Sequence, residues 1–208
     1  RMDLGRPLAT VTPTLDGDVL QVLATHDVSF TAGQVRRVLN NFSEEGIRKV
    51  LARLQAQGVV LVERVGNVSA YRLNSAHLAA PPIIALAGLF STFLKKLEET
   101  LETWEPQPKY AAVFGSAVRG TMSTDSDIDL LLVGQRMSPE WESLVHQLAA
   151  RVTSWTGNDA RIVEYSVEEL GSARSEPVLQ DVLAHGLTVA GSRSWLLKQL
   201  QPAAARTK

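Results

Sequence analysis

The chain has 208 residues, of which 45% are apolar and 21% are charged, as in an ordinary globular protein and unlike a fibrous or disordered one. A formal net charge of −1 argues against a generic polyanion-binding protein, and the absence of cysteine excludes disulfides and thiolate metal sites. No apolar run reaches the roughly eighteen residues of a membrane-spanning helix, so we expect a soluble, cytoplasmic protein without a membrane partner.

The first residues are interpreted as an N-terminal arm over residues 1–13, because they carry two prolines and no regular apolar spacing. Two helices are expected next. Thr14 is a suitable N-cap for a helix that extends to about Ala24, and Thr31 is suitable for a second helix that ends at Leu39.

A third helix is expected between Ser43 and Gly58. Its apolar residues fall at i, i+3, i+4 and i+7, which places them on one face; they are Ile47, Val50, Leu51 and Leu54. The rest of its surface carries three basic residues between small alanines, a composition that allows a close approach to DNA; they are Arg48, Lys49 and Arg53. Strands at residues 59–64 and 70–73 around a Gly66-Asn67 turn then indicate a hairpin.

Three helices followed by a hairpin resemble the winged helix-turn-helix of bacterial transcription regulators. The resemblance implies that residues 14–78 bind double-stranded DNA, with the third helix in the major groove and the hairpin against the backbone. The implied contacts are Arg48, Lys49 and Arg53 on the third helix, Arg64 and Arg72 on the hairpin, and Arg36 and Arg37 on the second helix. In the alternative, a small helical domain makes only protein contacts, since residues 1–80 hold just 9 basic against 7 acidic side chains.

The sequence Ala79-Ala80-Pro81-Pro82 marks a boundary, after which a long apolar helix over residues 79–106 is expected to link two domains. Residues 107–208 then predict a second domain with a small mixed sheet flanked by helices, so the fold class of the chain is α+β. Its strands are expected at residues 110–114, from 127, at 160–166 and at 186–189, and its helices at residues 139–157, 177–184 and 194–200.

The most informative stretch reads KYAAVFGSAVRGTMSTDSDIDLLLV and covers residues 109–133. Its first strand ends in Gly115-Ser116, and its second strand opens with Asp127 and Asp129. Carboxylates at i and i+2 of a strand project from the same side, and a divalent cation such as Mg²⁺ relieves their repulsion. A glycine and a serine with accessible amides suit a phosphate, so the stretch indicates a metal-dependent nucleotide site.

This pattern resembles the nucleotidyltransferase superfamily of DNA polymerase β type, in particular its minimal branch. The residues that carry the resemblance are Phe114, Gly115, Ser116, Asp127, Ile128, Asp129 and Leu130, and the ending AHGLTVAG also looks like the terminal segment of that branch. The resemblance implies two Mg²⁺ ions held by Asp127 and Asp129. It also implies an NTP whose β- and γ-phosphates lie against Gly115 and Ser116, with Arg119 beside the phosphates.

The family places a third carboxylate on the next strand, and this chain departs from that pattern. Alignment from Gly157 puts Arg161 at the expected position. Glu164 is the preferred candidate for the third carboxylate, although it would face the other side of the strand from Arg161. Asp159 lies at the edge of a loop, and the remaining alternative is that the third carboxylate is missing.

Two interpretations follow. In the first, the chain is a DNA-binding transcription regulator whose nucleotidyltransferase domain binds NTP–Mg²⁺ and transfers a nucleoside monophosphate to a hydroxyl of a protein, RNA or small molecule. In the second, the domain is catalytically inactive and serves a transcriptional repressor as a nucleotide sensor or dimerisation scaffold. A homodimer is expected, because winged helices commonly read two half-sites.

Overall fold

The computed structural model describes residues 1–201, which divide into two compact units. One unit contains Arg6–Phe90, and the other contains Arg1–Gly5 together with the residues from Ser91 onward. The chain therefore passes between the units twice, after Gly5 and after Phe90. Each unit has a hydrophobic core of its own.

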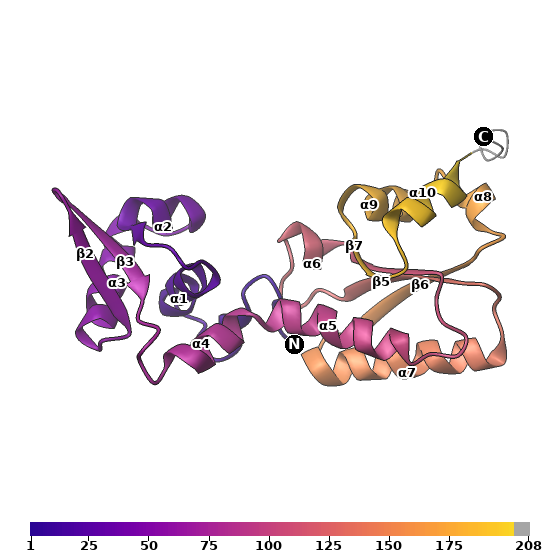
Figure 1. Cartoon of the computed structure of the whole chain (residues 1–208), viewed down its shortest axis with the longest axis horizontal. Coiled ribbons are helices and arrows are strands. Elements are labelled where there is room, and N and C mark those ends of the chain that lie inside the picture. Colours follow the sequence, from indigo (N-terminus) through magenta and orange to yellow (C-terminus); the bar gives the residue numbers. More distant parts are fainter. Residues whose placement is uncertain (202–208) are drawn as a thin grey trace. The chain divides into compact units, whose positions relative to one another are not determined.

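The unit of residues 6–90 consists of short helices and one small sheet (Figure 1). Its elements are η1 (Pro7–Thr10), α1 (Leu15–Thr25), β1 (Phe30–Thr31), α2 (Ala32–Val38), α3 (Glu44–Ala56), β2 (Val60–Val65), β3 (Val68–Leu73) and α4 (Ala80–Ala87). The sheet has the order β1-β3-β2, and both pairings are antiparallel. The two-residue strand β1 was not expected from the sequence, because only its pairing with Ala70 and Tyr71 makes it a strand.

Local signals place these helices. Thr31 and Gln34 form a reciprocal capping box at the start of α2, and the Ser43 hydroxyl accepts a hydrogen bond from the Gly46 amide at the start of α3. The helices bury the residues that their spacing selects, and the most completely buried are Val19, Val35, Ile47 and Leu51. The core of this unit therefore lies between α1, α2, α3 and the sheet.

The helix expected over residues 79–106 is two helices, α4 and α5 (Leu89–Glu102), with Gly88 between them. The helix is interrupted at Gly88 because glycine is a weak helix residue; its amide still donates to the Ile84 carbonyl at the end of α4. No single helix within residues 1–201 is long and apolar enough to cross a membrane, and α4 and α5 meet that requirement only when taken together.

The second unit is built on a four-stranded mixed sheet with the order β6-β5-β4-β7. Besides α5, its elements are β4 (Tyr110–Phe114), α6 (Ser116–Arg119), β5 (Ile128–Gly134), α7 (Pro139–Thr156), β6 (Ala160–Ser166), α8 (Leu170–Ala173), α9 (Pro177–His185), β7 (Leu187–Ala190) and α10 (Arg193–Leu200). Strands β5 and β6 are parallel, whereas β4 is antiparallel to β5 and to β7. Helices and small sheets together confirm the α+β class.

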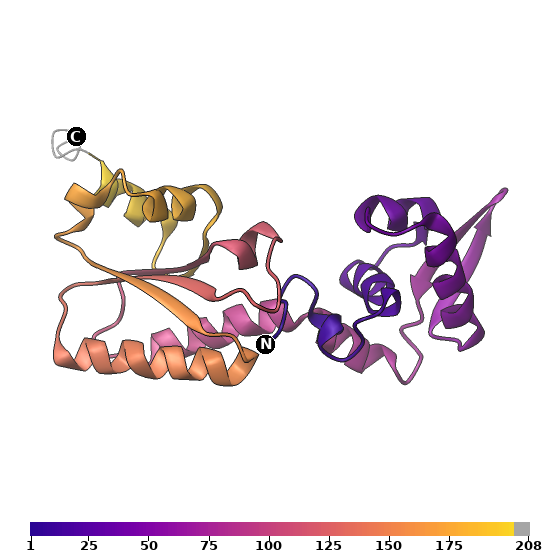
Figure 2. The same cartoon turned by 180° about the vertical axis from the view of Figure 1, so that it is seen from behind.

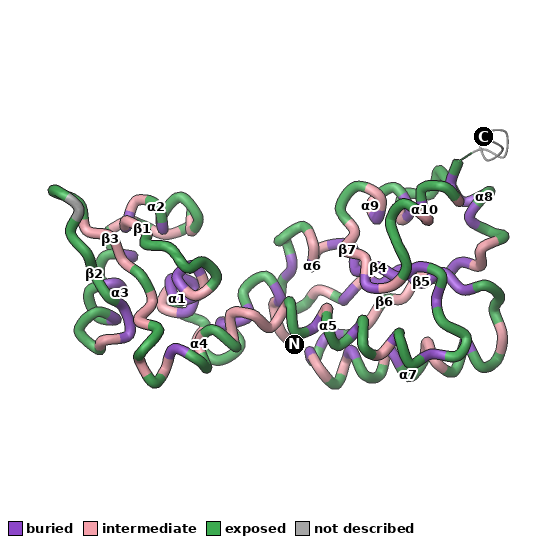
Figure 3. The backbone as a smooth tube through the Cα atoms, in the orientation of Figure 1, coloured by how far each residue is buried: buried purple, intermediate pink, exposed green. Residues whose placement is uncertain are grey.

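Helices cover both faces of this sheet. Helices α5 and α7 lie on one face, and α9 and α10 lie on the other (Figures 1 and 2). The central strands β4 and β5 are almost entirely buried (Figure 3). On the α9 face, Phe114, Leu131 and Val133 pack with residues of α8, α9 and α10. Because strand side chains alternate, residues at odd positions of β5 face α9 and residues at even positions face α7.

Candidate nucleotide site

Gly115 forms the sharp connection between β4 and α6. Its φ of 74° and ψ of −147° belong to a region that only glycine adopts easily. A Cβ atom at this position would overlap the carboxylate of Asp129, which lies on the neighbouring strand in register with Phe114. The sequence folds in this way because the glycine supplies both the turn and the space for the acidic side chain.

Ser116 opens the short helix α6, whose last residue is Arg119. The Arg119 amide donates to the Gly115 carbonyl, with a nitrogen–oxygen distance of 3.2 Å, and Gly120 then ends the helix in a left-handed conformation. The glycine turn and the first residue of α6 thus stand directly beside the acidic strand β5. The structure places Gly115 against Asp129, and Ser116 follows Gly115 as the first residue of α6.

Asp127 and Asp129 differ in their surroundings. The Asp127 side chain is half exposed at the start of β5, whereas Asp129 is partly buried. Burial raises the pKa of Asp129 above its ordinary value. The positive charge of Arg161 opposes this rise in pKa, and the like charge of Asp127 adds to it. Smaller effects come from Arg119, which lowers the pKa, and Asp181, which raises it. The two carboxylates are therefore close enough to repel each other.

Arg161 lies in register with Asp129 on the adjacent parallel strand β6. Residues in register on neighbouring strands project to the same face, so the guanidinium and the Asp129 carboxylate share the face that α9 covers. Its electrostatic effect on the pKa of Asp129 agrees with this placement. A cation thus stands where a third carboxylate was sought.

Glu164 does not join the acidic pair, and this corrects its expected role as the third carboxylate. It is in register with Leu132, three residues beyond Asp129 and therefore on the opposite face. Its carboxylate accepts a hydrogen bond of 2.7 Å from the indole Nε1 of Trp141, a fully buried residue of α7. Glu164 satisfies a buried donor in the core, as strand alternation requires.

Asp159, the other candidate, lies just before β6. Its carbonyl accepts a hydrogen bond from the Ile128 amide at 2.9 Å, and its carboxylate pairs with Arg1. The Arg1 guanidinium is also 4.0 Å from the Asp127 carboxylate and donates to the Asp125 carbonyl. Asp159 is therefore engaged at the edge of the site by a basic side chain.

Two residues of α9 that were not expected from the sequence, Asp181 and His185, contact the site through Arg119. The Arg119 Nη1 donates to Asp181 Oδ1 over 2.8 Å, and the His185 Nδ1 lies 3.2 Å from the same oxygen. Asp181 and His185 are four residues apart on one helix, a spacing that signals their mutual contact. Nothing in the local sequence links α9 to α6, because that contact arises from tertiary packing.

The donor set suits one kind of cation. Within residues 1–201 no group of three or more His, Cys, Asp or Glu side chains is arranged to hold a metal ion. Asp127 and Asp129 supply two carboxylates, which match the protein ligands of an Mg²⁺ ion that completes its shell with water and substrate phosphates. Among these residues no further carboxylate is grouped with Asp127 and Asp129 to hold a second ion.

The basic residues proposed for DNA lie on the surface of the other unit. On α3, Arg48 pairs with Glu44, Lys49 pairs with Glu45 at 2.7 Å, and Arg53 pairs with Asp16 of α1. The basic side chains of α2 and the hairpin are exposed; they are Arg36, Arg37, Arg64 and Arg72. A cavity of about 300 Å³ lies between the first turns of α2 and α3 and the hairpin, and Arg48 lines it.

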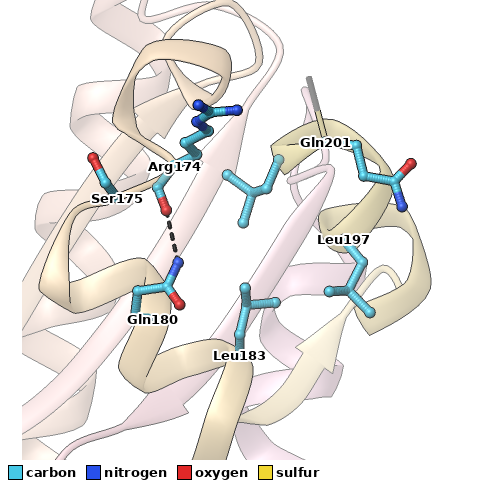
Figure 4. A pocket seen from close by; sticks show the side chains of 7 residues that line it. Arg174, Ser175, Gln180, Leu183, Leu197 and Gln201 are labelled. Atoms are coloured by element: carbon cyan, nitrogen blue, oxygen red, sulfur yellow. Dashed lines mark hydrogen bonds between the residues drawn. The ribbon is translucent and has the colours of Figure 1, made fainter. Parts of the chain in front are cut away.

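A further cavity of about 510 Å³ lies in the nucleotide-site unit, between the α8–α9 connection, α9 and α10 (Figure 4). Its walls combine leucines, such as Leu183, with a few polar side chains, such as Arg174 and Gln201. None of the residues proposed for the nucleotide site lines it. It is therefore a separate feature of the unit.

Comparison with known proteins identifies a nucleotidyltransferase domain at residues 94–180, where the chain matches the sequence model of that family. The matched region includes the glycine turn, both aspartates and β6. Domains of this family generally use divalent metals such as Mg²⁺. No curated protein matches the chain.

Two solved structures are similar to part of the chain. One is a toxin–antitoxin crystal structure with AMP-PNP, with a TM-score of 0.38 and 19% identity over 51% of this chain and 79% of that chain. The other is a mutant of the toxin–antitoxin MntA–HpeT, with a TM-score of 0.37 and 16% identity over the same shares of the two chains.

Proposed function

We propose that the chain is a DNA-binding transcription regulator whose nucleotidyltransferase domain binds an NTP with Mg²⁺ as a regulatory ligand. The observation that carries this proposal is the register of Arg161 with Asp129. The nucleotidyltransferase pattern normally places a third carboxylate on this strand, where it holds the catalytic ion and helps to deprotonate the acceptor hydroxyl. A guanidinium at this position repels a cation and cannot accept a proton.

The remaining residues support nucleotide binding. Asp127 and Asp129 would hold one Mg²⁺, which when bound neutralises phosphate charge and polarises the phosphate bonds. Gly115 lets the backbone approach a phosphate without a side chain in the way, and Ser116 contributes its hydroxyl. Arg161 on β6 and Arg119 in the helix after β4 come from the two strands that flank β5, and they add two cationic side chains near Asp129. Such a site favours a polyphosphate anion.

Transfer of a nucleoside monophosphate to a protein, RNA or small-molecule hydroxyl is the second candidate function. It is favoured by the first half of the motif, in which Gly115 lies against Asp129 and Asp127 precedes Asp129 by two residues. Two Mg²⁺ ions would then be needed, and the third carboxylate would have to come from a residue other than Glu164, which is engaged with Trp141.

The DNA-binding part of the proposal rests on the topology of residues 14–78. Three helices precede a hairpin, which is the order on which the resemblance to a winged helix rests, and the short strand β1 pairs with the hairpin strand β3. The helix α3 presents Arg48 and Lys49 outward, and each is neutralised by a glutamate one turn earlier. Exposed pairs of this kind are worth little, so phosphates can replace the glutamates at small cost. We propose a cytoplasmic homodimer that reads two half-sites.

Titration with labelled NTPs and Mg²⁺ tests the nucleotide site. We expect saturable, Mg²⁺-dependent binding without transfer of label, and loss of that binding in the Asp127→Ala/Asp129→Ala variant. Label transfer that disappears in this variant supports the second candidate function. Transfer that persists in the variant refutes the proposed metal site.

Duplex binding tests the winged-helix assignment. The Arg48→Ala/Lys49→Ala variant should bind mixed-sequence duplex DNA more weakly and with a flatter dependence on salt, because fewer counterions are released. The matched control is Lys95→Ala/Lys96→Ala on α5, which removes the same charge from the other unit. Equal binding by both variants and the parent chain removes α3 from the interface.

A further inference from the structure

Asp181 of α9 holds the side chain of Arg119, a residue of the candidate nucleotide site. The carboxylate belongs to α9, and the guanidinium belongs to α6, directly after the Gly115-Ser116 turn. Their contact is a hydrogen bond of 2.8 Å between Nη1 and Oδ1. The Asp181 side chain is 21% exposed and the Arg119 side chain 45% exposed, so the acid is the more firmly enclosed partner.

His185 fixes the carboxylate in turn. Its Nδ1 lies 3.2 Å from the Asp181 oxygen that also accepts from Arg119. One oxygen is therefore contacted by two side chains, one from its own helix and one from α6. Helix α9 covers the sheet face to which Asp129 belongs, and α6 follows directly on β4, the strand next to β5, so the pair lies at the same face of the sheet as Asp129.

We propose that Asp181 is a positioning residue for the nucleotide. It anchors one N–H donor of Arg119, so that the guanidinium is fixed beside the Gly115-Ser116 turn before a nucleotide arrives. This inference rests on the proposed function, in which Arg119 contacts the phosphates. Arginine carries five N–H donors in a rigid fork, so one donor used by a carboxylate orients the others.

The energetic reason is the cost of ordering a long side chain. A free arginine loses rotamer entropy when it binds a phosphate, and an arginine that is already held loses less. Removing Asp181 also removes a negative charge near the phosphates, which by itself favours anion binding. The positioning effect and the charge effect have opposite signs, and only the positioning effect requires Arg119.

A double-mutant cycle separates the two effects. The four proteins are the parent chain, Asp181→Asn, Arg119→Ala and the combination, each titrated with ATP, ADP and AMP in the presence of Mg²⁺. We expect Asp181→Asn to weaken ATP binding about tenfold, the scale of one charged hydrogen bond. In the Arg119→Ala background, the same change should not weaken binding at all. The loss should be largest for ATP and smallest for AMP, because the β- and γ-phosphates are proposed to lie against Gly115 and Ser116, and Arg119 belongs to the short helix that starts at Ser116.

Three controls keep the result interpretable. Glu168→Gln removes one negative charge from an exposed position of the same unit and should leave ATP binding unchanged. Thermal unfolding of each variant establishes that it is folded. Asp181→Glu retains the charge but moves it by one methylene, and we expect it to weaken ATP binding less than Asp181→Asn does.

Several results would overturn the inference. One is unchanged or tighter ATP binding by Asp181→Asn. Another is an equal loss of ATP affinity on this change whether or not Arg119 is present. The third is an equal loss of affinity for ATP and for AMP. If the parent chain binds ATP and only these comparisons fail, the inference is wrong and the proposed function stands. If the parent chain binds no nucleotide, both are wrong.

Discussion

At the scale of single residues, Gly115 is the position of the nucleotide site where both the backbone conformation and the available space require glycine. Its backbone lies in a region that other residues reach at a cost of about 1–3 kcal/mol, and a Cβ would meet the Asp129 carboxylate. We expect Gly115→Ala to destabilise the unit by at least about 2 kcal/mol in urea unfolding and to abolish Mg²⁺-dependent NTP binding.

The matched control for this change is Gly120→Ala. Gly120 also has a positive φ, of 69°, but its φ and ψ are those of a left-handed helix, and a Cβ added there would meet no atom of residues 1–201 within 4 Å. The variant should lose about 1 kcal/mol and keep its affinity for NTP. Equal losses of affinity in the two variants would show that backbone strain alone, without the contact to Asp129, explains the effect.

Arg161 is the residue that decides between a sensor and an enzyme. Arg161→Asp places a carboxylate in register with Asp129, and we expect Mg²⁺ to bind the nucleotide-free protein about tenfold or more tightly, because an added carboxylate supplies a ligand in place of a repelling cation. Titration calorimetry with Mg²⁺ measures this change. Arg161→Ala, which removes the cation and adds no ligand, should fall between the two proteins. If Arg161→Asp binds Mg²⁺ no more tightly than Arg161→Ala, the position is not directed at the metal.

At the scale of elements, a buried tyrosine connects β6 with the start of α9. The Tyr165 hydroxyl donates to the Glu176 carboxylate next to the first residue of α9, and its side chain is 8% exposed. Burial first, and then the contact with Glu176, raises the pKa of Tyr165 to about 12. Helix α9 also carries Asp181, so this contact helps to place the partner of Arg119.

A raised pKa makes this contact sensitive to alkaline pH. The folded protein retains the phenol proton where the unfolded chain, with a tyrosine pKa near about 10, has lost it. The stabilisation is therefore complete below pH of about 10 and falls as the pH approaches 12. At pH 8 the free energy of unfolding of Tyr165→Phe, measured with urea, should be lower than that of the parent chain by about 1–2 kcal/mol. Between pH 8 and 11 the variant should lose less of its free energy of unfolding than the parent chain does. Parallel stability curves for the two proteins would refute this role of Tyr165.

The sequence predicts those elements whose signals are local. The caps at Thr31 and Ser43 and the apolar spacing of α3 placed the helices of the first unit, and the glycine turn with its two aspartates placed the centre of the site. Strand alternation also indicated that Arg161 and Glu164 face opposite sides, but it could not tell which of them faces Asp129. That answer depends on the register of β5 with β6, a tertiary feature. The contact of Asp181 with Arg119 was missed for the same reason, since it depends on how α9 packs against the sheet.

At the scale of the whole molecule, the two units have separate cores, and the chain crosses between them at two points. Each core contains enough buried apolar residues to support a cooperative transition of its own. The proposed nucleotide residues all belong to one unit, and the proposed DNA contacts all belong to the other. The proposed regulation then requires that nucleotide binding in one unit changes DNA affinity in the other, a coupling that must be equal in both directions.

This division predicts two unfolding transitions that respond differently to nucleotide. All four tryptophans lie in the nucleotide-site unit, at positions 104, 141, 155 and 195, so their fluorescence reports that unit alone, whereas far-ultraviolet circular dichroism reports both. ATP–Mg²⁺ at about 100 times its Kd should stabilise the fluorescence transition by about 2.7 kcal/mol, because only the folded unit binds it. The second transition, seen only by circular dichroism, should move far less, by no more than the coupling free energy between the sites. Asp127→Ala/Asp129→Ala should abolish the shift, and a single transition that moves as a whole in both signals would show that the two units unfold together.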